Sequence, residues 1–395
     1  MKNYENTIRA CFIGYIVQGI VNNFVPLLFI TFQSQYGIPL SEITMLITIN
    51  FMLQLGVDLA SAFFIDKIGY RASTLLAHGF AAAGLIMLAI LPEVMNPFWG
   101  LVVSVLFYAV GGGLLEVVIS PMVEACPSKH KARTMSMLHS FYCWGTVGVI
   151  AVSTLFFAVF GIHNWRTLAV LLAIIPIANG IFFAKAPIAA LSADENGGLA
   201  IKQLFGKKIF WVFLLIMCCS GASEQAVSQW ASAFAEKALG ISKSIGDIAG
   251  PTLFSALMGV SRLIYGKFGG KISLDKMMIS SSLLCVLAYL VISLSASPAM
   301  GLIGIAVSGF AVGILWPGAY SKAAVSIKGG GTSMFALLAL AGDLGCSGGP
   351  TFAGRIAASA GDNLKTGILA AVVFPAVLTA ALVLMRKWKT AAPSR

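Results

Sequence analysis

The sequence contains very little charge. Only 10% of its 395 residues are Asp, Glu, Lys or Arg, whereas 58% are hydrophobic. Soluble globular domains average about 25% charged and roughly 45–50% apolar residues. Apolar runs of about 20 residues, which is the length that spans a bilayer as a helix, recur along the whole chain and are too numerous for one buried core. The scarcity of charge therefore excludes a soluble globular protein and indicates an integral membrane protein.

Other signals are also missing. The seven cysteines show no disulfide or zinc-binding spacing, so packing is the simplest role for each. The first apolar run follows Lys2 and Arg9 but has no small-residue cleavage site, so we interpret it as a retained helix rather than a signal peptide. No segment has the composition of a soluble domain. We expect a membrane-embedded protein with no metal site and no organic cofactor.

Twelve apolar segments are long enough to cross a membrane. They must be helical, because lipid offers no partner to unpaired backbone amides. The sequence therefore predicts an all-α integral membrane fold. The expected spans are 8–32, 43–65, 71–91, 98–122, 133–160, 166–184, 209–234, 246–266, 274–295, 299–321, 332–356 and 365–385.

The distribution of basic residues predicts the orientation. Most of the 26 Lys and Arg residues fall in the loops that are cytoplasmic if both termini are cytoplasmic. This asymmetry follows the positive-inside rule. The net charge of +11 is thus explained by membrane orientation and not by nucleic-acid binding. We expect a multi-pass protein of the cell (inner) membrane with both termini in the cytoplasm.

The sequence indicates two related halves, each with six predicted spans. Residues 185–208 form the longest polar connection and separate six predicted spans from six others. DKIG at 66–69 is echoed by GKFG at 266–269, and GGGLLEVVISP at 111–121 by AVGILWPGA at 311–319. We expect an N-terminal bundle at 1–184, a central cytoplasmic loop at 185–208 and a C-terminal bundle at 209–395. Repeated six-helix halves with a site between them are typical of transporters.

The loop between the second and third spans carries a family resemblance. ASAFFIDKIGYR at 60–71 resembles the cytoplasmic signature of the major facilitator superfamily, although Ala62 replaces its first glycine. The resemblance implies two pseudo-symmetric six-helix bundles and a conformational latch at Asp66, Gly69 and Arg71. We assign Arg262, near the inner end of the eighth span, to the same latch. The alternative for the charged residues is an ordinary solvated pair.

Further segments resemble one branch of that superfamily. LLEVVISPM at 114–122 and TMSMLHSFYCWG at 134–145 are similar to the fucose permease branch of sugar/proton symporters, and GASEQAVSQW, MGVSRLIYG and GILWPGAYSKA, at 221–230, 258–266 and 313–323, agree. The resemblance implies that Glu116 carries the coupling proton. It also implies a second acid in the first span, where this chain has Pro26 instead.

Acidic side chains inside spans usually face the bundle interior or a water-filled cavity, because an ionised carboxylate in hydrocarbon is costly. Asp58, Glu116, Glu224 and Asp343 are placed in this way. We expect proton coupling by Glu116, Glu224 and Asp58, and a structural role for Asp343. The alternatives are a structural carboxyl at Glu116 and interhelical hydrogen bonding at Gln54 and Asp58.

Amide and aromatic side chains in the spans suit a polyhydroxylated solute, since amides bond hydroxyl groups and rings cover apolar sugar faces. Packing remains the alternative for each aromatic ring, and His139 is equally able to tune protonation or to bond within the bundle. The absence of Lys or Arg near the middle of any span favours a neutral or cationic solute. The predicted substrate-binding residues are Gln18, Asn22, Gln54, His139, Tyr142, Glu224, Gln225, Gln229, Trp230 and Trp316.

We therefore expect a proton-coupled symporter for a sugar or sugar-like neutral solute, working by alternating access as a monomer, with solute and membrane lipid as its partners. The alternative is a proton-coupled efflux antiporter for drugs or organic cations. CWGTVGVIAVS at 143–153 lacks the proline of the efflux motif, which disfavours it. A non-transporting sensor has no sequence feature against it. A membrane enzyme is disfavoured because the sequence shows no clustered catalytic groups.

Overall fold

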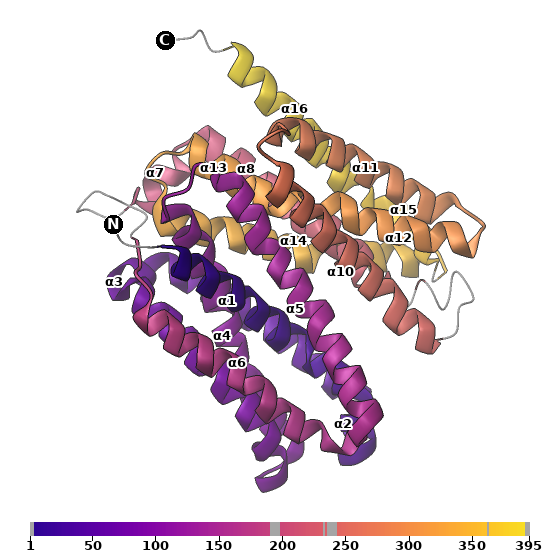
Figure 1. Ribbon diagram of the computed structural model, residues 1–395. Helices are drawn as coiled ribbons and strands as arrows, with labels where there is room; N and C mark the ends of the chain where they lie inside the picture. Colours follow the sequence, from indigo (N-terminus) through magenta and orange to yellow (C-terminus); the bar gives the residue numbers. More distant parts are fainter. Residues whose placement is uncertain (1–3, 190–197, 232–233, 235–242, 362, 392–395) are drawn as a thin grey trace. The chain divides into compact units, whose positions relative to one another are not determined.

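A computed structural model describes the chain except residues 1–3, 190–197, 232–233, 235–242, 362 and 392–395 (Figure 1). Within the described residues all regular structure is helical. The α-helices are α1 (Glu5–Asn23), α2 (Phe29–Tyr36), α3 (Leu40–Val94), α4 (Pro97–Ala125), α5 (Lys131–Phe160), α6 (Trp165–Lys185), α7 (Ile201–Phe205), α8 (Lys208–Ser228), α10 (Lys243–Phe268), α11 (Leu274–Leu294), α12 (Pro298–Val312), α13 (Leu315–Ser326), α14 (Gly331–Ser359), α15 (Leu364–Ala371) and α16 (Val373–Ala391). Two short 3₁₀-helices, η1 (Val25–Leu28) and η2 (Ile162–Asn164), join α1 to α2 and α5 to α6.

The helices confirm the predicted all-α fold of twelve spans. Nine segments of the described chain are long and apolar enough to cross a membrane, and one of them, Thr48–Val94, has 47 residues. Helix α3 is interrupted within that segment at Gly69, whose φ of 81° is not helical, so it crosses twice. Helices α10, with 26 residues, and α14, with 29, are also long enough to cross. The nine segments, the second crossing of α3 and these two helices account for the twelve spans.

The described chain divides into two compact units. Unit 1 comprises residues 1–128, 141–199 and 329–337, and unit 2 comprises 129–140, 200–328 and 338–395. The change from unit 1 to unit 2 at residues 199 and 200 falls inside the predicted central loop. Each unit also contains a short segment from the other half of the sequence, namely the start of α5 in unit 2 and the start of α14 in unit 1. We call residues 129–140 and 329–337 the exchanged segments.

Equivalent hydrogen bonds hold the exchanged segments in their units. In unit 2, the Ser136 hydroxyl at the start of α5 donates to the Arg262 carbonyl at 2.7 Å. In unit 1, the Ser333 hydroxyl at the start of α14 donates to the Ala62 carbonyl at 2.8 Å. The two acceptors lie two hundred positions apart, as do the DKIG and GKFG segments that follow them. The internal repeat read from the sequence therefore extends to a repeated contact.

Unit 1 is built on α3, which packs against α4 and α6, while α1 packs against α4 and α6 (indigo to magenta in Figure 1). Small residues allow the backbones to approach closely. A Cβ atom at Gly84 would lie 2.5 Å from the Tyr108 nitrogen, and one at Gly111 would lie 2.6 Å from the Ala81 nitrogen. Glycines thus set the spacing between α3 and α4.

The first span is interrupted in unit 1. Helix α1 ends at Asn23, and the short η1 turn contains Pro26, which cannot donate a backbone hydrogen bond. Helix α2 then completes the span. The break therefore comes directly after Asn22 and Asn23, two polar residues of the same span.

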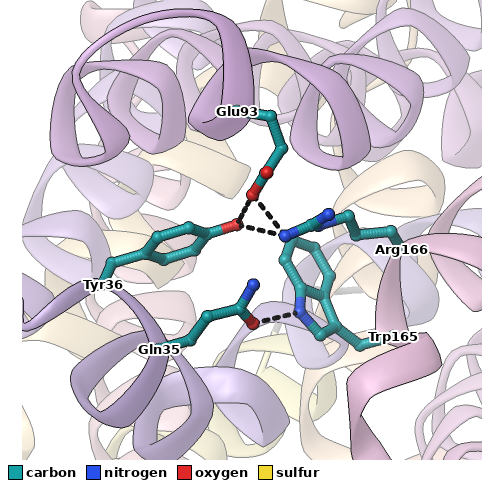
Figure 2. A network of polar contacts seen from close by, with 5 residues as sticks. All are labelled: Gln35, Tyr36, Glu93, Trp165 and Arg166. Atoms are coloured by element: carbon teal, nitrogen blue, oxygen red, sulfur yellow. Dashed lines mark hydrogen bonds and ion pairs between the residues drawn. The ribbon is translucent and has the colours of Figure 1, made fainter.

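A polar network fixes the far end of α2 to α3 and α6 (Figure 2). The Tyr36 hydroxyl donates to Glu93 Oε1 at 2.7 Å, and the Arg166 guanidinium pairs with the same carboxylate. The Trp165 indole N–H donates to Gln35 Oε1 at 3.0 Å. Burial and the hydrogen bond to the Glu93 carboxylate raise the pKa of Tyr36 to about 12, so the hydroxyl remains a donor at neutral pH. The second part of the first span is thus anchored at its end and interrupted at its start.

In unit 2, α8 packs against α12, α13 and α16, and α11 packs against α12 and α16 (Figure 1). Helices α8 and α14 come especially close. A Cβ atom at Gly345 would lie 1.9 Å from the Cys218 carbonyl oxygen, and one at Gly221 would lie 2.2 Å from the Gly342 carbonyl oxygen. The Tyr289 hydroxyl of α11 donates to the Ser223 carbonyl at 2.6 Å and anchors the opposite side of α8.

Gly345→Ala is expected to destabilise the protein, whereas Gly348→Ala, one turn along α14, is not. An added methyl group at residue 345 must displace backbone, and overpacking of this kind costs about 1–3 kcal/mol. Nothing lies within 4 Å of a Cβ atom at Gly348, where alanine also gains up to about 1 kcal/mol of helix propensity. Thermal unfolding of the two purified variants in the same detergent measures the difference. Equal unfolding temperatures would contradict the close approach of α8 and α14.

Candidate functional site

Each unit contains a cluster of polar side chains inside its spans that includes predicted site residues. The cluster in unit 1 comes from α1, α3 and α4, and the cluster in unit 2 comes from α8, α10 and the residues between α12 and α13. Both lie beside an interrupted helix. Interrupted spans are where membrane transporters expose backbone and side-chain groups to a solute.

In unit 1, α1 and α4 run antiparallel and present polar groups to each other once per turn. The Tyr15 hydroxyl lies 2.9 Å from Ser120 Oγ, and Gln18 Nε2 donates to Glu116 Oε2 at 2.8 Å. At the next turn, Asn22 faces Gly112, where an added Cβ atom would lie 3.6 Å from Asn22 Oδ1. Glycine at this step leaves space beside Asn22.

Helix α3 reaches the same space. Gln54 Nε2 donates to Asn22 Oδ1 at 2.8 Å and lies 3.3 Å from Asn50 Oδ1. Asn50, Gln54 and Asp58 follow at four-residue intervals and therefore share one face of α3. All three are buried, and Asp58 has no exposed surface. The structure thus joins Gln18, Asn22, Gln54 and Glu116 into one cluster, with Asp58 a turn further along α3.

The unit 1 cluster has an unused hydrogen-bond acceptor. Gln18 is 2% exposed, and its Oε1 atom has no hydrogen-bond partner among the described residues. A buried amide oxygen without a partner costs free energy, about 1–3 kcal/mol for a neutral group. A solute hydroxyl or a water molecule at this oxygen would remove that cost. The cluster is therefore suited to bind a group that donates hydrogen bonds.

Unit 2 contains a buried ion pair. Arg262 on α10 is 3% exposed, and its Nη2 atom lies 3.3 Å from Glu224 Oε2 on α8. Arg262 also donates from Nε to the Gly313 carbonyl at 2.8 Å and from Nη1 to the His139 carbonyl at 3.1 Å. Arg262 therefore lies inside the unit beside Glu224.

A break in the tenth span supplies one of these acceptors. Helix α12 ends at Val312 and α13 begins at Leu315. A helix end leaves carbonyl groups without intrahelical donors. The Gly313 carbonyl lies in this break and accepts from Arg262. The guanidinium thus stabilises the interruption and is held in place by it.

Amide side chains connect Glu224 to the surface of α8. Gln225 Nε2 lies 3.4 Å from Glu224 Oε1, and Gln229 Nε2 donates to Gln225 Oε1 at 3.0 Å. Glu224 is buried, Gln225 is half-buried and Gln229 is exposed. Gln225 and Gln229, which we call the amide ladder, connect the exposed end of α8 to the buried Glu224–Arg262 pair.

The predicted aromatic residues separate into different environments. The His139 ring lies 5.8 Å from that of Tyr320, which in turn meets Trp316 edge to face at 6.2 Å. Trp230 donates its indole N–H to the Pro350 carbonyl and therefore packs on α14. Tyr142 belongs to unit 1, where its carbonyl oxygen would lie 3.0 Å from a Cβ atom at Gly19. In unit 2, His139 thus contacts Arg262 through its carbonyl, and Trp316 packs on Tyr320 next to the His139 ring.

The predicted latch residues belong to both units, with Asp66, Gly69 and Arg71 in unit 1 and Arg262 in unit 2. Arg71 donates to the carbonyls of Phe183 at 2.9 Å and Ala186 at 2.8 Å, and so caps the last turn of α6. Gly69 takes the positive φ that the turn requires, while Asp66 is exposed. In unit 2, Arg133 caps the end of α10 in a similar way, through the carbonyls of Gly266 and Lys267.

Sequence reasoning missed several members of these clusters. Asn50 lies one turn before Gln54, and Tyr320 lies one turn after Trp316, so helical periodicity could have indicated both. No sequence signal paired Arg262 with Glu224, because they lie on different helices. Within the described part of the chain, no group of three or more His, Cys, Asp or Glu residues is arranged to hold a metal ion.

Comparison with known proteins identifies the family to which the chain belongs. The model of the Major Facilitator Superfamily matches residues 11–350, and the chain belongs to this family of membrane transporters. It is accordingly a multi-pass membrane transporter and not an enzyme. No curated protein sequence matches the chain significantly.

Solved structures of the superfamily share the fold. A fucose:proton symporter of E. coli, FucP, superposes with a TM-score of 0.83 at 14% identity, covering 97% of this chain and 99% of its own. A proton:xylose symporter, XylE, gives 0.80 at 12% identity, covering 97% and 95%. A human organic anion transporter gives 0.73 at 15% identity, covering 97% and 100%. At these identities the similarity establishes the fold alone.

Proposed function

We propose that this transporter is a proton-coupled symporter for a sugar or sugar-like solute. The observation that carries the proposal is the Gln18–Glu116 hydrogen bond in unit 1, where a carboxylate inside a span meets a buried amide next to further amides. Carboxamides can donate to and accept from solute hydroxyl groups, and a carboxylate in this position can take up a proton. Two of the structural relatives are named as proton symporters of the sugars fucose and xylose.

Proton binding would change the hydrogen bonding of Gln18. The ionised Glu116 carboxylate accepts from Gln18 Nε2. A protonated Glu116 can instead donate its O–H to Gln18 Oε1 after the amide rotates, which satisfies an oxygen that otherwise has no partner. Gln18 Nε2 is then free to donate to a solute hydroxyl. Proton and solute binding would support each other through this single amide.

The same proposal includes the cellular setting. The excess of basic residues in the predicted inner loops supports cytoplasmic termini and a cell (inner) membrane location. We also infer alternating access by movement of the two halves, which the family architecture supports. In this proposal Asp66, Gly69, Arg71 and Arg262 stabilise one of the two states. A single chain contains all the clusters described, which supports a monomeric transporter.

The efflux alternative is less well supported. An exporter of organic cations needs an acidic side chain that attracts a positive solute. Glu224 is already paired with Arg262, so the two charges offset each other. Net attraction for a cation at this position is therefore weak. The unit 1 cluster, with Glu116 among neutral amides, fits a hydroxyl-rich solute better.

Solute-driven proton uptake tests the proposal. Purified protein in proteoliposomes with an internal pH dye should acidify the lumen when a transported sugar is added outside. A panel of sugars and polyols selected by thermal shift supplies the solutes, because a bound solute stabilises the folded state. Efflux of a lipophilic cation in exchange for protons, with no response to any sugar, would contradict symport.

A further inference from the structure

The charge state of the solute can be argued from Arg262. The expectation of a neutral solute depended on the absence of Lys or Arg near the middle of the spans. Arg262 is nevertheless 3% exposed, lies next to an interrupted span and contacts Glu224, a residue of the predicted solute site. A buried guanidinium in such a place is a recognition group for carboxylates.

Two hydrogen bonds from its guanidinium to backbone carbonyls position Arg262. The Nε and Nη1 atoms donate to the carbonyls of Gly313 and His139, and these backbone groups cannot leave without moving a helix. Glu224 contacts Arg262 differently. The carboxylate reaches only Nη2, at 3.3 Å. Charge-assisted hydrogen bonds between guanidinium and carboxylate are shorter, about 2.7–2.9 Å, and are frequently bidentate. Glu224 is therefore the replaceable partner.

The amide ladder gives a polar approach to the same position. Gln229 is exposed, Gln225 is half-buried, and both side chains point along α8 toward Glu224 through successive hydrogen bonds. Amides can exchange hydrogen bonds with sugar hydroxyl groups at each step. A hydroxylated solute that carries a carboxylate can thus find partners for both kinds of group in unit 2.

We propose that Arg262 binds a carboxylate of the solute in exchange for Glu224, so that the transporter carries acidic sugars such as aldonates or uronates. The inference rests on the proposed function and names its substrate class. When the solute carboxylate takes the place of Glu224 on the guanidinium, Glu224 loses its counter-charge and takes a proton from the aqueous phase. One proton then enters with each solute anion, and the charge within the site is unchanged.

The surrounding titratable groups make this exchange testable by pH. Among the described residues, the titratable groups near the Glu224–Arg262 pair include His139 on α5, Tyr289 on α11 and Tyr320 on α13. The ordinary pKa values of glutamate and histidine lie below neutral pH, whereas those of tyrosine and arginine lie well above it. Glu224 and His139 are therefore the two candidates among these groups for a pH dependence in this range. Sugar acids remain ionised between about pH 5.5 and 7.5, so any pH dependence of their binding in this range belongs to the protein.

The test compares D-glucuronate with D-glucose, its neutral counterpart, by calorimetric titration of the purified protein near pH 5.5 and near pH 7.5. We expect D-glucuronate to bind at least about tenfold more tightly than D-glucose, and about tenfold more tightly at the lower pH. Glu224→Gln should raise the affinity at the higher pH and remove the pH dependence, because the competing carboxylate is gone. Arg262→Gln should abolish the preference for the acid.

Two control variants separate the roles of Glu224 and Arg262 from those of other titratable groups in unit 2. Asp275→Asn removes a different carboxylate of unit 2, which pairs with Lys322, and should leave D-glucuronate affinity unchanged. His139→Gln should retain the pH dependence that Glu224→Gln loses. The inference is overturned if wild type prefers D-glucose, or if Glu224→Gln binds D-glucuronate no better. Neutral sugars that bind and drive proton uptake would then leave the proposed symport intact, whereas no proton uptake with either class would reject the proposed function itself.

Discussion

Glu116→Gln should abolish solute accumulation in response to a proton gradient and preserve solute exchange. The amide keeps the shape of the carboxyl group and can still bond Gln18, but it cannot carry a proton. For one proton per neutral solute, a membrane potential of 100 mV supplies about 2.3 kcal/mol and sustains roughly 50-fold accumulation. The variant should equilibrate its solute without accumulation. Uptake and counterflow of a radiolabelled solute in proteoliposomes measure the two activities separately.

Glu124→Gln is the matched control for this prediction. It changes an acid to an amide on the same helix, α4, two turns further on. Since Glu124 is not assigned to proton coupling, the variant should accumulate solute as wild type does. Wild-type accumulation by Glu116→Gln would show that the proton is carried elsewhere. Loss of both accumulation and exchange would indicate that Glu116 is needed for solute binding or folding instead of coupling.

Arg262→Gln should have the largest effect on stability. It leaves the Glu224 carboxylate buried without its counter-charge and removes the donors to the Gly313 and His139 carbonyls. Breaking a buried ion pair from one side typically costs about 3–5 kcal/mol. Glu224→Gln should cost less, because the arginine retains its two carbonyl acceptors. Unfolding temperatures of the purified variants in detergent rank the three proteins.

The double variant Glu224→Gln/Arg262→Gln tests whether the unpaired Glu224 carboxylate causes the loss of stability in Arg262→Gln. With both charges removed, it should be more stable than Arg262→Gln alone, giving a coupling energy of up to about 3 kcal/mol in a double-mutant cycle. The Lys322–Asp275 pair provides a comparison, because the Asp275 side chain is 33% exposed and solvent screens the interaction. Its coupling energy should be smaller. Additive effects at Glu224 and Arg262 would mean that the two side chains do not form a significant pair.

These two predictions concern different kinds of carboxylate. Glu116 meets a neutral amide, so a proton can change its charge without leaving an arginine unpaired. Glu224 faces a guanidinium and can be neutralised only if another anion takes its place or Arg262 is exposed. Proton coupling by Glu116 is therefore independent of solute charge. Participation by Glu224 depends on it.

The amino-acid sequence alone was sufficient to predict membrane insertion, the helices and the family. Lipid excludes unpaired backbone groups, so each long apolar run had to be a helix. Within the described residues, the helices agree with the predicted spans. Helical periodicity also placed Gln54 with Asp58, and Glu224 with Gln225 and Gln229, on single faces. These properties depend on residues that are close in the chain, and local spacing determines them.

Only the tertiary structure decided which of these faces meet. Gln18 and Glu116 are separated by 98 residues and Glu224 and Arg262 by 38, and their pairing depends on the rotation and register of packed helices. Close approaches such as Gly345 against Cys218 set that register, together with interruptions such as the one at Gly313. The free energy of helix packing is spread over many contacts between distant segments. For this reason the sequence identified Arg262 as a charged residue near the end of a span, and only the folded chain placed it against Glu224.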